Sequence, residues 1–209
     1  MSPRIWAFHR LLDRPVSFTG RVLLLAAIVA LLVGGTLPLW RISLVAPQYS
    51  EGLTLDMYAY QIVAGNKGQD LAEINTLNHY IGMKPIAQAD FLEMKLLPFA
   101  IGAFSLLALR AAAVGRVLSL VDLAVLFCYF GAFSLGSFAY RLYTYGHHLD
   151  PHAPMKIKPF MPVVFGSQQI ANFQQTSLPL VGTACMAAFL VLVLAGLWSS
   201  VRTGRRDEV

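Results

Sequence analysis

The chain has 209 residues, of which 56% are hydrophobic and only 13% are charged. Soluble globular proteins carry about 25% charged residues, so this composition excludes an ordinary water-soluble domain and indicates a chain that lies in a membrane. The formal net charge of +5 does not indicate a nucleic-acid-binding protein, because the basic residues are divided among short, separate segments instead of forming one patch.

Four apolar runs, each long enough to cross a bilayer, follow one another along the chain. The hydrocarbon core of a bilayer requires about 20 apolar helical residues, so we predict transmembrane helices at residues 21–40, 96–114, 117–140 and 178–199. The first run is too long for the apolar part of a signal peptide, and no A-x-A cleavage site follows it, so we expect an uncleaved helix. The sequence therefore predicts an all-α membrane protein that forms a single membrane domain over residues 1–209.

The basic residues predict the orientation of these helices. Nine arginines lie before the first helix, in or beside the hairpin of the second and third, or after the fourth: Arg4, Arg10, Arg14, Arg21, Arg110, Arg116, Arg202, Arg205 and Arg206. The two long loops, residues 41–95 and 141–177, carry seven basic and seven acidic residues. Because lysine and arginine are enriched on the cytoplasmic side, we expect both termini to be cytoplasmic and both loops to face the periplasm from a bacterial inner membrane.

The first long loop is expected to contain short elements of its own. Residues 53–63 alternate with the period of a strand. The stretch "QDLAEINTLNHYIGM" has helical spacing, with Asp70 as a candidate N-cap and Gly82 as a candidate C-cap. A short interfacial helix is expected at residues 87–99, where the chain enters the second transmembrane helix.

The second long loop is rich in proline, which disfavours helix at and just before its own position. We therefore expect an irregular and stiff excursion after residue 140, with a short helix at residues 166–175, "GSQQIANFQQ". Together the two loops would form an outward cap over the four transmembrane helices.

Arg110 and Asp122 are the two charged residues well inside the predicted helices. They lie six residues on either side of Arg116, which would place them at the same depth in two antiparallel helices. A charge inside a membrane is costly and usually faces a partner, so we predict an Arg110–Asp122 ion pair near the cytoplasmic end that sets the register of the hairpin. A proton or ion relay is the alternative, but two charges near one end do not make a path across the bilayer.

Histidine is absent from the predicted transmembrane helices. An intramembrane haem is disfavoured for this reason, because four-helix membrane cytochromes hold haem through histidines on facing helices. The helices also lack the polar line and the paired broken segments of a transporter. No hydrolytic triad or phosphate-binding loop appears in the sequence, so we assign no catalytic residue and expect a non-catalytic subunit.

The outward loops contain residue types that bind copper. His79 precedes Met83 by four residues, so both would share one face of a helix, and imidazole with thioether suits copper. In the stretch "YGHHLDPHAPM", residues 145–155, His147 and His152 flank Asp150 and would add further ligands. The spacing matches no specific zinc motif. A copper site at His79, Met83, His147 and His152 is thus one hypothesis, and ordinary loop histidines are the alternative.

The same loops carry uncharged polar and aromatic residues suited to a protein interface, where tyrosine is enriched. We consider partner binding more favoured than chemistry for this surface. The residues expected to dock a partner are Tyr49, Asn78, His79, Tyr80, His147, Asp150, Gln168 and Asn172.

Several phrases of the sequence together resemble one family: "LPLWRISLVAPQYSEGL", "EINTLNHYIGMKPI", "ADFLEMKLLPFAIG", "YGHHLDPHAPMKI" and "IANFQQTSLPLVG". They resemble small four-helix membrane proteins of nitrous-oxide-reductase (Nos) gene clusters, the NosB-type proteins, over most of the chain from Leu37 onward. The chain departs from the family pattern at Ser50, where proline is expected, and at His148, where asparagine is expected. The resemblance implies a membrane partner of a periplasmic copper enzyme or of its maturation system, and it implies no reaction.

Three hypotheses follow from the sequence. The leading one is an accessory subunit that docks or anchors a periplasmic or membrane redox protein among the membrane lipids, in copper-enzyme respiration of nitrous oxide. The second is a copper-handling maturation protein. The third is a quinol-interacting electron-transfer subunit, which would need a quinone pocket near one membrane face.

Overall fold

The computed structural model describes residues 9–170 and 173–206. Arg4 and Asn172, which were used in the predictions above, lie outside these residues. The chain divides into two compact units. The helical unit comprises the described parts of Met1–Gly35, Phe99–Gly131 and Ala184–Val209, and the sheet unit comprises those of Thr36–Pro98 and Ala132–Thr183.

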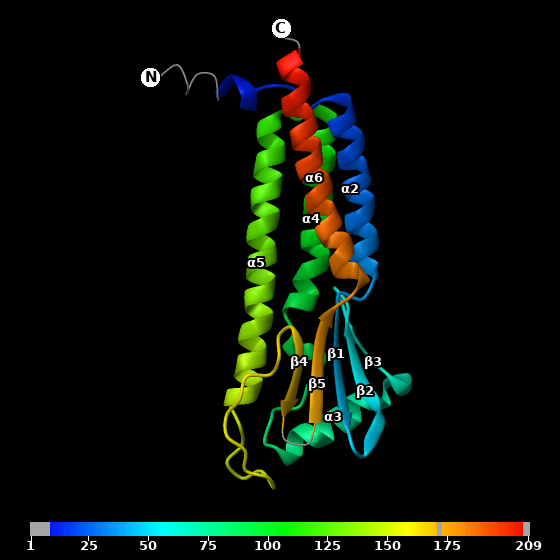
Figure 1. Cartoon of the computed structure of the whole chain (residues 1–209), viewed down its shortest axis with the longest axis vertical. Coiled ribbons are helices and arrows are strands. Elements are labelled where there is room, and N and C mark those ends of the chain that lie inside the picture. Colours follow the sequence, from blue (N-terminus) through cyan, green and yellow to red (C-terminus); the bar gives the residue numbers. More distant parts are fainter. Residues whose placement is uncertain (1–8, 171–172, 207–209) are drawn as a thin grey trace. The chain divides into compact units, whose positions relative to one another are not determined.

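Four long apolar helices confirm the predicted number of membrane-spanning segments (Figure 1). In the described part of the chain these are α2 (Phe18–Thr36), α4 (Glu93–Val114), α5 (Val117–His147) and α6 (Val181–Arg206). Each is long and apolar enough to cross a membrane. The length and composition of these helices are therefore those of a multi-pass membrane protein.

Two helix boundaries differ clearly from the predicted ones. α2 ends at Thr36, four residues before the predicted end, because Trp40 opens a strand. α5 continues to His147 instead of ending at residue 140. Residues 140–145 contain no glycine or proline, so nothing in them ends the helix. Their polar side chains show only that this part of α5 lies beyond the apolar run.

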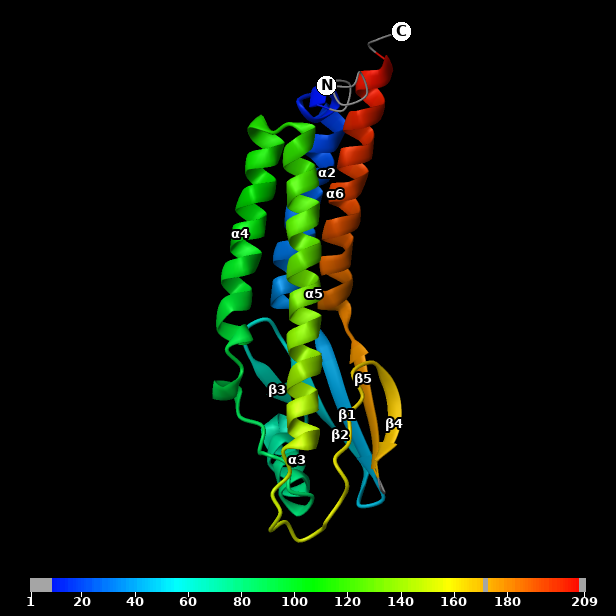
Figure 2. The ribbon, with the colours of Figure 1, turned by 90° about the vertical axis from the view of Figure 1, so that its left-hand side faces the viewer.

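The helical unit packs through apolar side chains and small residues, and Figure 2 shows the hairpin that joins α4 to α5. Phe127 of α5 contacts Phe189 of α6, with their ring centroids 4.6 Å apart, and Phe189 is fully buried. α2 and α6 approach closely at Gly20, where an added Cβ would lie only 2.7 Å from the Ser200 Oγ. Small residues at such crossings allow two helix backbones to approach in a membrane protein.

The sheet unit contains five antiparallel strands in the order β3-β2-β1-β5-β4. They are β1 (Trp40–Ala46), β2 (Tyr49–Met57), β3 (Ile62–Ala64), β4 (Gly166–Ile170) and β5 (Phe173–Pro179). The expectation of an all-α protein was therefore incomplete. The strand predicted at residues 53–63 corresponds to parts of β2 and β3, whereas β1 was not predicted, because it begins at the last residue of the first predicted helix and continues into the first predicted loop.

The short helix predicted at residues 166–175 is wrong, because β4 and β5 form a hairpin there. β5 pairs with β1 along its length, with Ser43 opposite Thr176 and Ile42 opposite Ser177. Pairing with a segment from the other end of the chain overrides a weak local preference for helix. The expectation of irregular structure is confirmed for residues 148–165, which contain no regular helix or strand.

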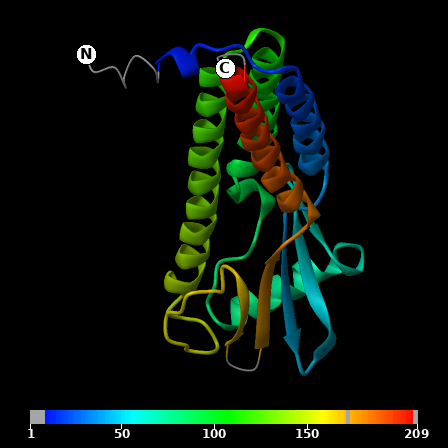
Figure 3. The same ribbon diagram turned by 45° about the horizontal axis from the view of Figure 1, so that its top comes forward.

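One face of the sheet is covered by α3 (Gln69–Tyr80), which crosses the strands in Figure 3. Leu53 and Leu55 of β2 form a buried cluster with Ile74 of α3. Asp70, expected as the N-cap, lies instead in the first turn of α3, where its Oδ2 accepts a hydrogen bond of 2.8 Å from the Thr54 backbone N–H. This bond joins the start of α3 to β2.

Candidate functional site

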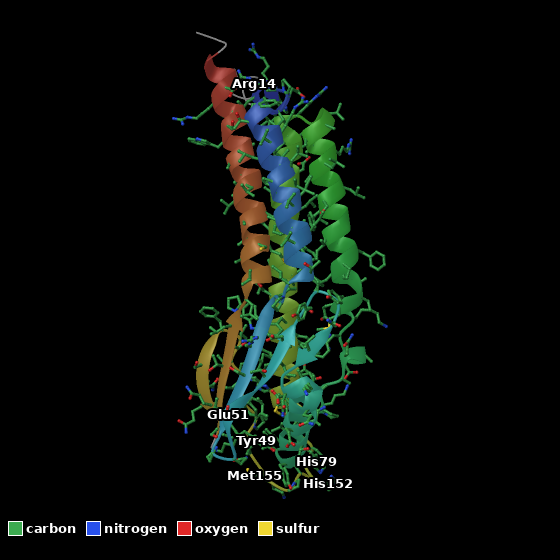
Figure 4. All side chains as sticks on the ribbon, turned by 90° about the vertical axis from the view of Figure 1, so that its right-hand side faces the viewer. Arg14, Tyr49, Glu51, His79, His152 and Met155 are labelled. Carbon is green, nitrogen blue, oxygen red and sulfur yellow. The ribbon has the colours of Figure 1, made fainter. Side chains whose placement is uncertain are left out.

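The end of α3 and the loop after α5 form one surface, called the tip surface, and it is made by His79, Tyr80, Gly82, Met83, His147, Asp150, His152 and Met155. Two backbone hydrogen bonds join its segments: the Asp150 N–H donates to the Gly82 carbonyl at 2.8 Å, and the Met155 N–H donates to the Tyr80 carbonyl at 2.9 Å. His79, His152 and Met155 lie at the same end of the sheet unit in Figure 4.

Gly82 allows the two segments to approach each other. Its φ of +79° is in the left-handed region, which favours glycine. An added Cβ would lie 2.9 Å from the Asp150 nitrogen and 2.9 Å from the Ala153 Cβ. The residue expected to cap α3 is therefore also the residue that seats the second loop against the first.

The structure brings three of the four predicted copper ligands around one open hollow of about 530 Å³. His79 and Met83 line it from the first loop, and His147 lines it from the end of α5. His148 and Asp150 line the same hollow. The described residues contain no group of three or more His, Cys, Asp or Glu side chains placed to hold a metal ion, so a ligand set here would need the Met83 thioether.

His152, the fourth predicted ligand, does not line this hollow. Its backbone N–H donates a 2.8 Å hydrogen bond to the Asp150 Oδ1, and its Nδ1 lies 3.3 Å from the same oxygen. The backbone hydrogen bond is the main reason that the pKa of Asp150 lies below its ordinary value. His152 and Asp150 thus form a local turn contact.

His147 has a defined orientation although it lies at the last residue of α5. Its ring stacks on Tyr143, with centroids 3.8 Å apart, and its Nδ1 lies 3.0 Å from the Tyr143 carbonyl oxygen. The other ring nitrogen, Nε2, has no partner among the described residues. His147 is therefore presented by a helix and not by the proline-rich turn in which the sequence placed it.

The predicted docking residues do not form a single surface. His79, Tyr80, His147 and Asp150 belong to the tip surface, and Gln168 is exposed on β4. Asn78 is buried and faces the interior of the sheet unit, so its assignment to docking was wrong. The reason is helical spacing, since Asn78 lies four residues after the buried Ile74 on the same face of α3.

Tyr49, also predicted to dock a partner, is held within the sheet unit. Its hydroxyl donates a hydrogen bond to Glu73 of α3, and this bond raises the pKa of Tyr49. The phenol is engaged as a link between β2 and α3, although part of its ring remains accessible.

The predicted Arg110–Asp122 ion pair is wrong. Both side chains are exposed, and the structure shows no ion pair between them. The buried faces of α4 and α5 carry Ala108 and Leu123 instead. Equal depth in two antiparallel helices does not place two residues on facing sides, and here both point away from the helix–helix contact.

An ion pair that the sequence predictions missed lies at the other end of the same two helices. Arg141 of α5 holds the Glu93 carboxylate of α4 with its Nη2, at 2.8 and 2.7 Å, and donates through Nη1 to the Asp90 carbonyl at 2.8 Å. The Ser137 hydroxyl donates to Glu93 at 2.6 Å, and the guanidinium lies 4.7 Å from the centroid of the Phe91 ring. Glu93 and Arg141 lay outside the helices predicted at residues 96–114 and 117–140, so the sequence prediction did not consider them as partners.

Comparison with known proteins does not identify the chain: no protein-family model and no curated protein matches it. The resemblance to the nitrous-oxide-reductase cluster family therefore stays a prediction from the quoted phrases.

Proposed function

We propose that this protein is an integral membrane accessory subunit that docks a redox protein through its tip surface. In this proposal both termini are cytoplasmic and the sheet unit faces the periplasm of a bacterial inner membrane. The setting is copper-enzyme respiration of nitrous oxide, as the resemblance in the sequence implies. The proposal makes the protein a non-catalytic partner.

The observation that carries the proposal is the exposed apolar part of the tip surface. Tyr80 is 52% exposed and Met155 is 49% exposed, and a backbone hydrogen bond between them holds the two residues side by side. Aromatic residues and methionine are enriched in protein interfaces, and histidines His79 and His152 flank them. A surface of this kind suits a partner that places an apolar patch at its centre and polar groups around it.

Site-specific photo-crosslinking in native membranes tests docking. A photoreactive residue at Tyr80 or at Met155 should capture one redox protein, identified by its haem or copper and by mass spectrometry. A photoreactive residue at Val63 of β3, which is 40% exposed and lies outside the tip surface, is the matched control. The docking proposal fails if Tyr80 and Met155 capture nothing or if Val63 captures the same protein.

A second candidate function, copper handling, is favoured by the hollow that His79, Met83 and His147 line. Two imidazoles with a thioether form a ligand set that suits Cu(I). Competition of the purified protein with a colorimetric Cu(I) chelator measures binding directly. His79→Ala and Met83→Leu should each weaken Cu(I) binding at least tenfold, whereas His148→Gln in the same hollow should leave it unchanged. Equal effects of all three changes would argue against this ligand set.

A further inference from the structure

The sheet unit contains a partly open apolar cavity of about 100 Å³ between the sheet, α3 and the last turns of α5. Apolar side chains line most of it, among them Leu55, Ile74 and Phe138. Four polar side chains also reach it: Asn78, Arg141, Tyr145 and Gln175. An apolar pocket with a few converging polar groups is the usual form of a small-molecule site.

Two of these polar groups have donors without an acceptor. Among the described residues, neither the Asn78 Nδ2 nor the Tyr145 hydroxyl has a hydrogen-bond partner, although both atoms are shielded from solvent. Asn78 is only 6% exposed. Leaving a buried donor unpaired costs about 1–3 kcal/mol. A bound molecule with two acceptor oxygens would satisfy both donors.

Arg141 does not present a free positive charge to the cavity, because its guanidinium donates to Glu93 and to the Asp90 carbonyl. Its charge is thus neutralised within the sheet unit. This makes the cavity suited to an uncharged ligand rather than to a carboxylate or a phosphate, which would compete with Glu93.

The length of α5 places the cavity near a membrane surface. Its 31 residues extend over about 46 Å at about 1.5 Å per residue, whereas the hydrocarbon core is about 30 Å thick. Phe138, Arg141, Leu142 and Tyr145 line the cavity from the last third of this helix. A helix that begins to cross the membrane at Val117 would carry these residues out at the opposite interface.

We propose that this cavity binds the head group of a membrane quinone, with one carbonyl oxygen at the Asn78 amide and the other at the Tyr145 hydroxyl. An apolar ring with two acceptor oxygens, dissolved in the bilayer, matches the apolar lining, the two donors and the position on α5. A cavity of about 150 Å³ in an engineered protein holds one benzene ring. The cavity of the sheet unit is smaller than this, so a monocyclic head group fits only when flexible residues such as Met57 and Met83, which both line the cavity, move aside.

Quenching of Trp40 fluorescence by a short-chain benzoquinone tests the proposal. Trp40 lies against Phe138, with ring centroids 5.5 Å apart, and Phe138 lines the cavity. The chain contains three tryptophans, so Trp6→Phe with Trp198→Phe leaves Trp40 as the single reporter. The purified protein in mild detergent should show saturable quenching by the benzoquinone, and weaker quenching by a bicyclic naphthoquinone at equal concentration.

Asn78→Leu and Tyr145→Phe should each weaken benzoquinone binding about fivefold or more. Both variants are expected to fold, because each removes a polar atom that has no partner, and thermal unfolding checks this. Tyr140→Phe, on the same helix but 71% exposed, is the matched control and should bind normally. Quenching that does not saturate, or that is equal in all variants, would mean partition into detergent or a cavity that holds only water, and either result overturns the proposal.

The test uses the purified protein alone, so its outcome is independent of partner docking. A protein that binds the quinone but is not crosslinked to a redox protein would retain the cavity proposal and lose the docking proposal. The reverse result would retain docking and lose the quinone site.

Discussion

Different kinds of interaction stabilise the interior of the helical unit and the interior of the sheet unit. In the helical unit, buried residues such as Leu24, Leu120 and Phe189 are apolar, and glycine allows α2 to approach α6. In the sheet unit, Arg141 and Asp70 link helices and strands through charged hydrogen bonds. The interior of the helical unit is thus stabilised mainly by apolar packing, and its Arg116–Asp13 ion pair is exposed. The sheet unit depends more on a small number of polar links beside an incompletely filled interior.

The largest effect is expected from the Glu93–Arg141 pair. Arg141→Met should destabilise the sheet unit by about 3 kcal/mol, because removal of one partner leaves the other charge partly buried and unpaired. The two side chains are 25% and 30% exposed, which lowers the effect below that of a fully buried pair. Thermal unfolding in detergent measures it. Arg116→Met, which breaks the Arg116–Asp13 pair whose side chains are 65% and 64% exposed, should cost less than about 1 kcal/mol; equal losses would contradict the assignment.

The close contact in the helical unit should tolerate less volume than the open parts of the same helices. Gly20→Val should destabilise the protein by about 2 kcal/mol through overpacking, since an added Cβ already meets the Ser200 Oγ at 2.7 Å and the Gly196 carbonyl oxygen at 3.0 Å. Gly131→Ala, where an added Cβ meets nothing within 4 Å, is the control and should be neutral or slightly stabilising. A destabilised Gly131→Ala with an unaffected Gly20→Val would reverse the interpretation.

The link between α3 and β2 should have a smaller and more local effect. Asp70→Ala removes the acceptor of the Thr54 backbone N–H, at 2.8 Å, and should cost about 1.5 kcal/mol. Hydrogen exchange at the Thr54 amide should become faster, while exchange in α6 stays unchanged. Glu73→Gln, which keeps an acceptor for the Tyr49 hydroxyl, serves as the control. Faster exchange throughout both units would mean that the two do not respond separately.

The smallest expected effect concerns pH at the tip surface. The hydrogen bond from the His152 N–H lowers the pKa of Asp150 below 3.8, so its stabilising contribution is present above the pKa of the unfolded carboxyl. The contribution is lost as the pH falls through the folded value. An NMR titration of carboxyl-labelled aspartate, assigned with Asp150→Asn, should give a midpoint below the ordinary one. A midpoint at or above 3.8 would show that the turn does not hold the carboxylate.

The two units also differ in how far the sequence could predict them. Hydropathy is a property of each segment alone, so the four long helices were predicted in number and approximate position. The pairing of β1 with β5 joins segments from opposite ends of the chain, and no local pattern encodes it. To predict whether Arg110 and Asp122 face each other, the rotational position of each residue around its helix is needed as well as its depth in the membrane.

The candidate site was predicted in part, but not through the helical spacing on which the prediction rested, because α3 ends at Tyr80 and Met83 lies beyond it. His79 and Met83 were expected to share a surface, and both line the hollow with His147. Asn78 could have been recognised as buried from its four-residue spacing to Ile74. The inward position of Tyr145 could not be recognised in the same way, because the predicted helix ended at residue 140. The prediction therefore did not place Phe138, Arg141 and Tyr145 on one helix face. The approach of Asp150 to Gly82 depends on a long-range contact that sequence alone does not specify.

The central position of β1 has a consequence in time during synthesis of the protein. β1 and β2 are adjacent in sequence and can pair early, but β5, the other neighbour of β1, follows only after residues 47–172 have been made. At about 5–20 residues per second, one edge of β1 waits for roughly 6–25 s. An unpaired strand edge is prone to wrong pairing, so maturation of the sheet unit awaits the last segments of the chain, and truncation before β5 should leave a product that is degraded or aggregates.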